Sequence, residues 1–370
     1  MKKKVLFFLF KLNGGGAERT VVNIVNKLDE NKYDVVLVLG NDKNNEYLNL
    51  ISKHITVKFL NCNKLRYCLF KLRKSIIEEE PNLIFTTMNP NNLMVILSKI
   101  ISLKKTPVII REANNRTESG SVTWLNKFMT KVFYNISDKV VALSQGVRED
   151  LIENFEVNKD KIKVIYNPVD IGYINKVKDE GIEDIDIDPS QKLIISVGRL
   201  EEQKDFSTLI RAFSLVVKKV DSKLIILGKG SQEKQLKRLC EELDIAEKVL
   251  FLGFKENPQK YVNLSDLFVL TSKWEGFGHV IVEAMAVGTP VIVTNCKSGP
   301  NEIIKNDQYG ILAEVENYQD IAMKIITLLE DDERRLYYSN KGLERACDFN
   351  SEEIVKQYEK LFTKVIDGKV

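Results

Sequence analysis

Residues 275–285 read Glu275-Gly-Phe-Gly-His-Val-Ile-Val-Glu283-Ala-Met, and the sequence Gly-Thr-Pro follows at 288–290. Two carboxylates eight residues apart bracket a glycine-containing turn, and the turn leads into an apolar run that is compatible with a helix. A helix N-terminus exposes unpaired N–H groups and the positive end of its dipole, which favour anions such as phosphate. The carboxylates can accept hydrogen bonds from hydroxyl groups on either side. The stretch therefore predicts a site for a phosphate flanked by polyhydroxyl groups, as in a nucleotide sugar.

This segment resembles the Glu-x7-Glu signature of retaining glycosyltransferases of family 4, which have the two-domain GT-B fold. In that family the first Glu faces the donor sugar and the second holds the nucleotide ribose, which implies these roles for Glu275 and Glu283. The resemblance also implies donor contacts for the residues between them, Gly276, Phe277, Gly278 and His279, although His279 has a structural role as an equal alternative. The other interpretation is a capped amphipathic helix with two solvated carboxylates.

Short apolar runs rich in β-forming residues alternate with amphipathic helical stretches along almost the whole chain. The predicted strands are 5–10, 35–39, 57–60, 83–87, 108–110, 139–143 and 163–166 in the first half, and 193–197, 223–227, 249–252, 267–270 and 291–294 in the second. Continuous apolar strands separated by helices indicate parallel sheets covered on both faces. We therefore expect an α/β protein with two Rossmann-like domains, which in the GT-B fold face each other across a cleft.

The expected domain boundaries follow the same pattern. Residues 1–168 form the acceptor-binding domain, 169–190 a linker rich in Asp, Glu and Gly, and 191–349 the nucleotide-sugar-binding domain. Residues 350–370 contain a last helix, with Ile354, Tyr358, Leu361 and Val365 at helical spacing. The resemblance to GT-B proteins implies that this helix crosses back to the first domain.

Three glycines, Gly14, Gly15 and Gly16, follow the first strand and open a helix. Glycine permits a tight turn and lets backbone N–H groups approach a phosphate closely. Such a turn is most often only a turn, and Arg19 occupies the third glycine position of the dinucleotide fingerprint. The loop is similar to the glycine-rich loop of family 4, which implies that Gly15 and Gly16 contact the donor diphosphate.

Two cations follow the first strand of the second domain. Arg199 and Lys204 lie five residues apart in Gly-Arg-Leu-Glu-Glu-Gln-Lys, where a planar guanidinium and a compact ammonium can clamp a diphosphate. The segment matches the Gly-Arg-Leu…Lys stretch of the family, although two surface cations in a charged loop are common. Phe254 and Lys255 occupy the position at which the family packs and reads the base.

The acceptor side is expected at two strand ends of the first domain, because ligands bind beyond the carboxyl ends of parallel strands. These strand ends carry Asn89, Arg111, Glu112 and Asn114. Many family members place a His near the second loop, but the histidines of this chain are His54 and His279. We expect Arg111, Glu112 or Asn114 to bind donor sugar or acceptor in its place.

The charge is strongly asymmetric. Residues 1–135 carry 22 Lys and Arg against 11 Asp and Glu, whereas the whole chain has a net charge of +3. This polarity suggests an anionic partner, and the scattered basic residues form no nucleic-acid module, so a membrane surface is the preferred interpretation. A basic helix at 64–77, with Phe70 among its cations, fits a helix on anionic headgroups, and a solvated face is the alternative.

Other patterns favour a cytosolic protein without a metal site. The five Cys form no C-x-x-C pair, and no stretch approaches the ~20 apolar residues that span a bilayer. The run Asp184-Ile-Asp186-Ile-Asp188 resembles a metal-binding Asp-x-Asp motif, but we interpret it as a solvated charge run in the linker. No cofactor beyond the nucleotide-sugar donor is expected.

These observations predict a retaining glycosyltransferase that moves a hexose or N-acetylhexosamine from a UDP-sugar to a lipid-linked or oligosaccharide acceptor. It would work on the inner face of the cell membrane, and its oligomeric state is left open. Two alternatives remain: a GT-B subunit that binds nucleotide sugar without transferring it, and a nucleotide-sugar epimerase or NAD-dependent enzyme, the last of which requires the missing glycine fingerprint.

Overall fold

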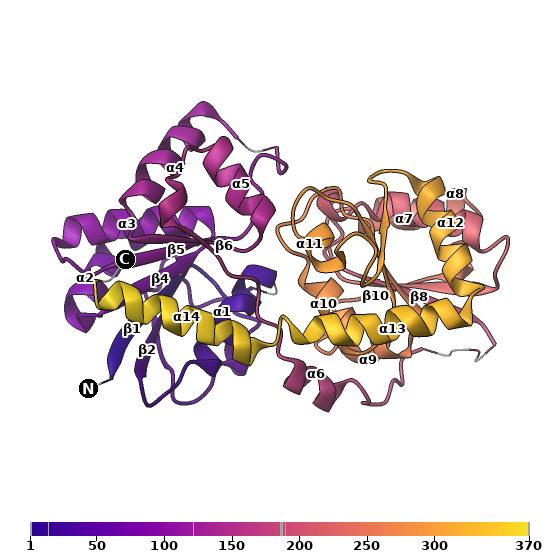
Figure 1. The fold of residues 1–370 in the computed structure, drawn as a ribbon, viewed down its shortest axis with the longest axis horizontal. Helices are drawn as coiled ribbons and strands as arrows, with labels where there is room; N and C mark the ends of the chain where they lie inside the picture. Colours follow the sequence, from indigo (N-terminus) through magenta and orange to yellow (C-terminus); the bar gives the residue numbers. More distant parts are fainter. Residues whose placement is uncertain (1, 14, 121, 186–187, 189, 369–370) are drawn as a thin grey trace. The chain divides into compact units, whose positions relative to one another are not determined.

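The computed structural model describes residues 2–13, 15–120, 122–185, 188 and 190–368, and the chain forms two compact units. The first unit contains residues 1–169 and 351–370, and the second contains residues 170–350. Each unit has a parallel β-sheet flanked by helices (Figure 1). The predicted α/β class with two Rossmann-like parallel sheets is confirmed.

The sheet of the first unit has seven strands in the order β3-β2-β1-β4-β5-β6-β7. Neighbouring strands are parallel throughout. The strands are β1 (Lys3–Leu9), β2 (Tyr33–Leu39), β3 (Thr56–Phe59), β4 (Leu83–Thr87), β5 (Val108–Glu112), β6 (Lys139–Ala142) and β7 (Ile162–Val164). The helices of this unit are α1 (Gly16–Lys27), α2 (Leu69–Glu79), α3 (Asn89–Ser102), α4 (Trp124–Ile136), α5 (Gln145–Glu153) and α14 (Ser351–Ile366).

The sheet of the second unit has six parallel strands in the order β10-β9-β8-β11-β12-β13. They are β8 (Lys192–Val197), β9 (Ser222–Leu227), β10 (Val249–Gly253), β11 (Leu267–Leu270), β12 (Val291–Thr294) and β13 (Ile311–Ala313). The helices are α6 (Ile171–Val177), α7 (Phe206–Val216), α8 (Glu233–Glu242), α9 (Gln259–Leu264), α10 (His279–Ala286), α11 (Pro300–Ile304), α12 (Tyr318–Leu329) and α13 (Asp332–Cys347). All twelve predicted strands are present, and the structure adds β13, an edge strand that the sequence analysis did not predict.

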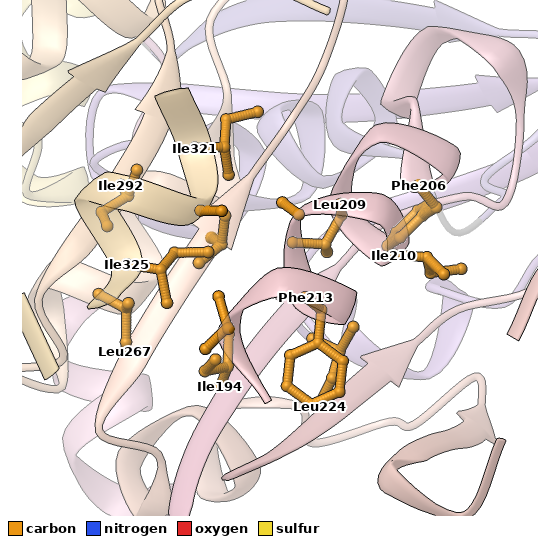
Figure 2. Close-up of a cluster of buried hydrophobic side chains, with 14 of the residues drawn as sticks. Ile194, Phe206, Leu209, Ile210, Phe213, Leu224, Leu267, Ile292, Ile321 and Ile325 are labelled. Atoms are coloured by element: carbon orange, nitrogen blue, oxygen red, sulfur yellow. The ribbon is translucent and has the colours of Figure 1, made fainter. Parts of the chain in front are cut away.

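The core of the second unit lies between its sheet and the helices α7 and α12. Apolar side chains of α7, such as Phe213, and of α12, such as Ile325, pack on Ile194 of β8 and Leu267 of β11 (Figure 2). Because parallel strands covered by helices are apolar on both faces, this packing explains the continuous apolar runs in the sequence.

The last helix belongs to the first unit. Helix α14 packs beside α1 (Figure 1), and its Phe362 ring lies 5.7 Å from Phe85 of β4 and 6.2 Å from Phe7 of β1. Tyr33 of β2 donates a hydrogen bond to the Glu359 carbonyl at 3.1 Å. The prediction that the C-terminal helix returns to the first domain is confirmed.

Two expectations about local structure need correction. Part of the expected linker, residues 169–190, folds as α6, which packs against α9 and α10, so it belongs to the second unit. The helix expected at 64–77 begins as a 3-10 turn at Leu65–Cys68 and becomes α-helical only from Leu69. Within the described ranges, no helix has the length and apolar character needed to cross a bilayer.

Candidate active site

The second unit brings several loops together at the carboxyl ends of its strands. Because β8, β11 and β12 are neighbours and parallel, the loops that follow them emerge at the same edge of the sheet. The loop after β8 carries Arg199 and ends in a 3-10 turn, Glu202–Lys204. The loop after β11 carries Glu275 and ends at α10.

Glu275 is the centre of this arrangement. Its side chain is only 8% exposed, and its Oε1 atom accepts hydrogen bonds from the Lys204 ammonium and, at 2.7 Å, from the Ser272 hydroxyl. Oε2 accepts no hydrogen bond from any residue that the structure describes. One carboxylate oxygen is therefore fixed by two donors, and the other is available for a ligand hydroxyl.

Backbone and amide contacts join the two loops around this carboxylate. Gln203 accepts a hydrogen bond from the Lys273 N–H at 2.9 Å, and its side-chain amide donates to the Trp274 carbonyl at 3.0 Å. The Thr271 hydroxyl lies 3.1 Å from the carbonyl oxygen of Lys204. The cation and the carboxylate thus sit on loops that hold each other in place.

Arg199 lies at the solvent side of the same loop. Its side chain is exposed, and its guanidinium donates a hydrogen bond to Gln203 Oε1 at 3.3 Å. An exposed guanidinium beside Lys204 provides the second positive charge expected for a diphosphate clamp.

The turn before α10 depends on glycine. Gly278 is the N-cap of α10 and has φ +93°, a conformation that side chains other than glycine rarely adopt. Gly299 approaches so closely that a Cβ atom there would lie 2.5 Å from the Phe277 Cα. The Phe277 ring packs edge-on against His279 and Phe349, with centroids 5.9 and 5.3 Å away. Phe277 is therefore a buried support of the turn, and its neighbours Gly276 and Gly278 shape the backbone.

Glu283 lies on α10 behind this turn. It is partly buried and lines a small crevice together with Val197 at the end of β8, Pro258, Gln259 and Val280. The ribose role of Glu283 therefore stays a prediction.

The two residues expected near the base differ in availability. Phe254 follows β10 and is 45% exposed, so its ring is accessible for stacking. The Lys255 ammonium is bound to Asp184, whose carboxylate also accepts hydrogen bonds from the Tyr261 hydroxyl at 2.7 and 2.9 Å. Lys255 is thus engaged within the protein, and Asp184 is its partner. Asp188 accepts from Ser190, and Asp186 lies outside the described residues.

In the first unit, the glycine loop leads into α1. Gly15 is the N-cap of this helix and Gly16 its first residue, whereas Gly14 lies outside the described residues. The carboxylate of Glu18 lies against Gly15, 2.5 Å from where a Cβ atom would stand. The Glu18 carboxylate therefore lies at this helix N-terminus, where the dipole favours negative charge.

The acceptor-side residues require a correction. Arg111 is fully buried, and its guanidinium donates to Thr87 Oγ1 at 3.0 Å and to Asn167 Oδ1. Glu112 is also buried, so neither side chain is accessible to a ligand in this structure. Successive strand residues point to opposite faces, and here both faces are covered. We therefore assign both residues to the scaffold.

Glu112 is part of a buried polar network. Tyr134 of α4 donates to its Oε2 at 2.6 Å, and the Ala113 N–H donates to its Oε1 at 3.0 Å. Asn89 and Asn92 of α3 donate to the Tyr134 hydroxyl at 3.1 and 3.0 Å. Burial raises the pKa of the Glu112 carboxyl, although the charge of Arg116 and these hydrogen bonds oppose the change. Burial also raises the pKa of Tyr134, which keeps the proton that it donates.

Asn114 and Met88 mark the part of these loops that faces outward. Asn114 is partly exposed, and its side chain makes no hydrogen bond within the part of the chain that is described. Met88, at the end of β4, has φ +71° and ψ +129°, an unfavourable backbone conformation for a non-glycine residue. Such strain is concentrated at functional sites, so the end of β4 and the Asn114 loop remain the preferred acceptor side.

The sequence did not reveal Ser272, Gln203 or Lys229. Ser272 holds Glu275, Gln203 joins Arg199 to the second loop, and Lys229 is an exposed cation whose carbonyl accepts from Leu200 N–H at 3.0 Å. The only signal for Ser272 was its position three residues before Glu275, and a serine there has no distinctive meaning by itself.

The architecture and these strand-end loops define a GT-B protein. The structure of Anabaena HepE in complex with UDP and glucose has the same fold, with a TM-score of 0.83 and 21% identity, and the match covers 98% of this chain and all of that one. The model described as Glycosyltransferase Family 4 matches residues 14–173, and the model described as Glycosyl transferases group 1 matches residues 177–345.

Sequence relatives extend over the full chain. The N-acetylgalactosamine-N,N'-diacetylbacillosaminyl-diphospho-undecaprenol 4-alpha-N-acetylgalactosaminyltransferase of Campylobacter jejuni is 32% identical over 369 residues, 96% of this chain and 98% of that protein. The amylovoran biosynthesis glycosyltransferase AmsD of Erwinia amylovora is 23% identical over 348 residues, 94% of this chain and 95% of that protein. This chain therefore belongs to the family 4 and group 1 glycosyltransferases.

Proposed function

We propose that this protein is a retaining glycosyltransferase that transfers a hexose or N-acetylhexosamine from a UDP-sugar to a lipid-linked glycan. The observation that carries the proposal is the Glu275 carboxylate, which has one oxygen fixed by Lys204 and Ser272 and the other open at the strand ends. Two relatives support the acceptor class. The name of the Campylobacter relative gives a diphospho-undecaprenol-linked saccharide as its acceptor, and that of the Erwinia relative refers to amylovoran biosynthesis. The UDP complex of a protein with the same fold supports the nucleotide.

The proposed division of roles follows the geometry of the second unit. Arg199 and Lys204 bind the diphosphate, Glu275 accepts hydrogen bonds from the donor sugar, and Glu283 accepts from the ribose. The backbone of Gly276 and Gly278 and the N-terminus of α10 face the phosphates. In the ligand-free protein Lys204 is paired with Glu275, so the diphosphate competes with Glu275 for this cation.

Retention implies attack on the face from which the nucleotide departs. The bond between the anomeric carbon and the diphosphate oxygen breaks, and its electron pair goes to the diphosphate. The acceptor hydroxyl oxygen bonds to the anomeric carbon, and its proton passes to the departing phosphate oxygen. The residues named above orient the reactants and stabilise the developing charge, which commonly contributes the largest part of catalysis. The 4-alpha linkage in the name of the Campylobacter relative agrees with retention of an α-linked donor.

We propose that the positive charges of Arg199 and Lys204 make a metal ion unnecessary. The acceptor binds at the strand-end loops of the first unit that contain Asn89 and Asn114, and the enzyme works at the inner face of the cell membrane. Transfer is expected to continue in excess EDTA. Loss of transfer on chelation, with recovery on adding Mn²⁺, would refute the metal-independent clamp.

A donor screen tests the function. UDP- and GDP-sugars are incubated with the protein, with and without a diphospho-undecaprenol-linked saccharide, and released nucleotide is measured. We expect release from a UDP-sugar that depends on the acceptor. Rapid release without an acceptor, or donor binding without any release, would instead favour an epimerase or a binding subunit.

A further inference from the structure

Helix α4 exposes large apolar side chains to solvent. Trp124 is 79% exposed, Phe128 54% and Leu125 53%, and they occupy the first two turns of the helix. The helix is well formed there, since the Thr123 side chain caps it by accepting from the Asn126 N–H at 3.2 Å. Exposed aromatic residues on an ordered helix indicate a surface that binds something.

The exposed large apolar residues lie on one side of α4. At 100° per residue, Trp124, Leu125, Phe128 and Ile136 fall within about one third of the helix circumference. The opposite side carries Thr130 and Tyr134, both fully buried. Thr130 and Tyr134 bind Arg116, Asn89 and Glu112, so the buried network fixes which side of α4 faces outward.

The neighbouring helices expose further large apolar side chains. Helix α3 packs against both α2 and α4, so the three form one layer on the sheet of the first unit (Figure 1). Leu103 at the end of α3 is 89% exposed and Phe70 of α2 is 74% exposed. Exposed cations lie on these helices and on the segments that flank them, namely Lys64, Arg66, Lys105 and Lys127. The layer is thus both apolar and positively charged.

We propose that this layer, formed by α2, α3 and α4, docks on an anionic lipid bilayer, and that Trp124, Leu125 and Phe128 of α4 insert among the headgroups. An amphipathic helix with Trp, Phe and Leu on one side and cations beside them has the chemistry of an interfacial helix. A second copy of the chain is a poorer partner, since it would bring two positively charged layers together. The proposal rests on the proposed function, which requires access to a lipid-linked acceptor.

Helix α2 has a lesser part in this contact than its sequence suggested. Lys71 donates to the carbonyl oxygens of Leu60 and Asn61 at 2.8 and 3.3 Å, and Arg73 donates to that of Ile101 at 3.0 Å. Lys74 lies 3.6 Å from Glu78. These cations stabilise the unit itself, so α2 contributes charge beside the contact, whereas α4 inserts.

Vesicle binding tests the proposal. The variant Trp124→Ser/Leu125→Ser/Phe128→Ser is compared with Leu264→Ser/Met323→Ser/Leu336→Ser, a change of three exposed apolar residues of the second unit. The wild type and the control should sediment with phosphatidylglycerol vesicles, less with phosphatidylcholine and less at high salt. The α4 variant should bind at least about tenfold more weakly. Equal binding by both variants, or no binding by the wild type, overturns the proposal.

Insertion has its own signal because Trp124 and Trp274 are the two tryptophans of the chain. In a Trp274→Phe protein, the emission of Trp124 should shift to shorter wavelength on phosphatidylglycerol vesicles and be quenched by brominated lipid. Unchanged emission on bound vesicles overturns insertion. Light scattering that shows a dimer lost in the α4 variant, with vesicle binding retained, would identify a second copy as the partner instead.

The outcome is separable from that of the proposed function. UDP titration and transfer to a short-chain, water-soluble acceptor report on the second unit and the chemistry, and both should be unchanged in the α4 variant. If the α4 variant loses vesicle binding and keeps both activities, the docking surface is supported. If the wild type binds vesicles but transfers no sugar, the proposed enzymatic function is wrong and the docking surface still stands.

Discussion

Two buried glutamates, one in each unit, show how position decides what a carboxylate can do. Glu275 and Glu112 both follow or end a parallel strand, and both are almost inaccessible to solvent. Glu275 is paired with the Lys204 ammonium and keeps Oε2 open. Glu112 accepts from Tyr134 and from backbone N–H groups on its two oxygens, and its direct partners carry no positive charge.

The different partners of the two carboxylates suit Glu275 to bind a ligand and Glu112 to support the fold. A charge is costly to bury unless it is paired, and the Lys204 ammonium provides such a partner for Glu275, whereas burial raises the pKa of Glu112. Glu112 instead joins α4 and α3 to the Asn114 loop. Helix α4, which we propose to dock on the membrane, and the Asn114 loop, which we propose to bind the acceptor, thus share one polar network.

The largest expected effect is at Lys204. Replacing it with Ala removes a charge from the diphosphate clamp and leaves Glu275 with Ser272 as its remaining described donor. Removing one such donor commonly lowers the rate roughly 100- to 1,000-fold. Steady-state kinetics should show this loss mainly in kcat, whereas Lys341→Ala, an exposed Lys paired with Glu344, should be unaffected. If Lys204→Ala retains most of its activity, the proposed role of Glu275 in binding the donor sugar does not depend on its pairing with Lys204.

A second effect concerns Glu283, which is partly buried and lies beside the crevice at the end of β8. A hydrogen bond to a charged group contributes roughly 1.5–3 kcal/mol, so Glu283→Gln should weaken UDP binding by about tenfold or more. Calorimetric titration measures this, and Glu344→Gln serves as a surface control. The same titration of Glu112→Gln should give wild-type affinity. Unchanged affinity in Glu283→Gln would remove Glu283 from the ribose site.

The sequence was more informative about the site of the second unit than about that of the first. Continuous apolar runs located twelve strands, because most of these strands are buried beneath helices. Helix α6, of seven residues, is too short to give a clear period, and the edge strand β13 was not predicted. The Gly-Arg-Leu…Lys and Glu-x7-Glu motifs singled out Lys204 and Glu275, and the structure brings these two together.

The acceptor-side residues were harder to predict from the sequence, because the position of a residue along a strand does not determine whether its side chain is buried or accessible. Arg111 and Glu112 are at a strand end, as the rule for parallel sheets requires, yet both side chains turn into the unit. Their partners Asn167 and Tyr134 lie 56 and 22 residues away in sequence. Such contacts arise from tertiary packing and leave no local pattern.

Ser272 offers a finer test of Glu275. Its hydroxyl donates to the same oxygen as Lys204, at 2.7 Å, and it is fully buried. Ser272→Ala leaves the charge pair but lets the carboxylate rotate, so kcat should fall about tenfold with little change in UDP affinity. Ser190→Ala, which removes an exposed hydroxyl bound to Asp188, is the matched control. A fall in melting temperature with normal kcat would make Ser272 a purely structural residue.

The smallest effect is expected at Glu112, and it depends on pH. Its folded pKa is raised above the ordinary 4.5, so the folded protein holds this proton more tightly than the unfolded chain. Both states are protonated well below 4.5. As the pH rises above 4.5 the unfolded chain ionises first, and the wild type loses about 1.4 kcal/mol of stability per pH unit until the folded pKa is reached. Glu112→Gln does not titrate there, so the stability difference in urea, wild type minus variant, should decrease from pH 4.5 to 8. If the stability difference between wild type and variant does not depend on pH, Glu112 ionises as freely as an exposed carboxylate. Glu112 would then be, like Glu275, a candidate to accept hydrogen bonds from a substrate.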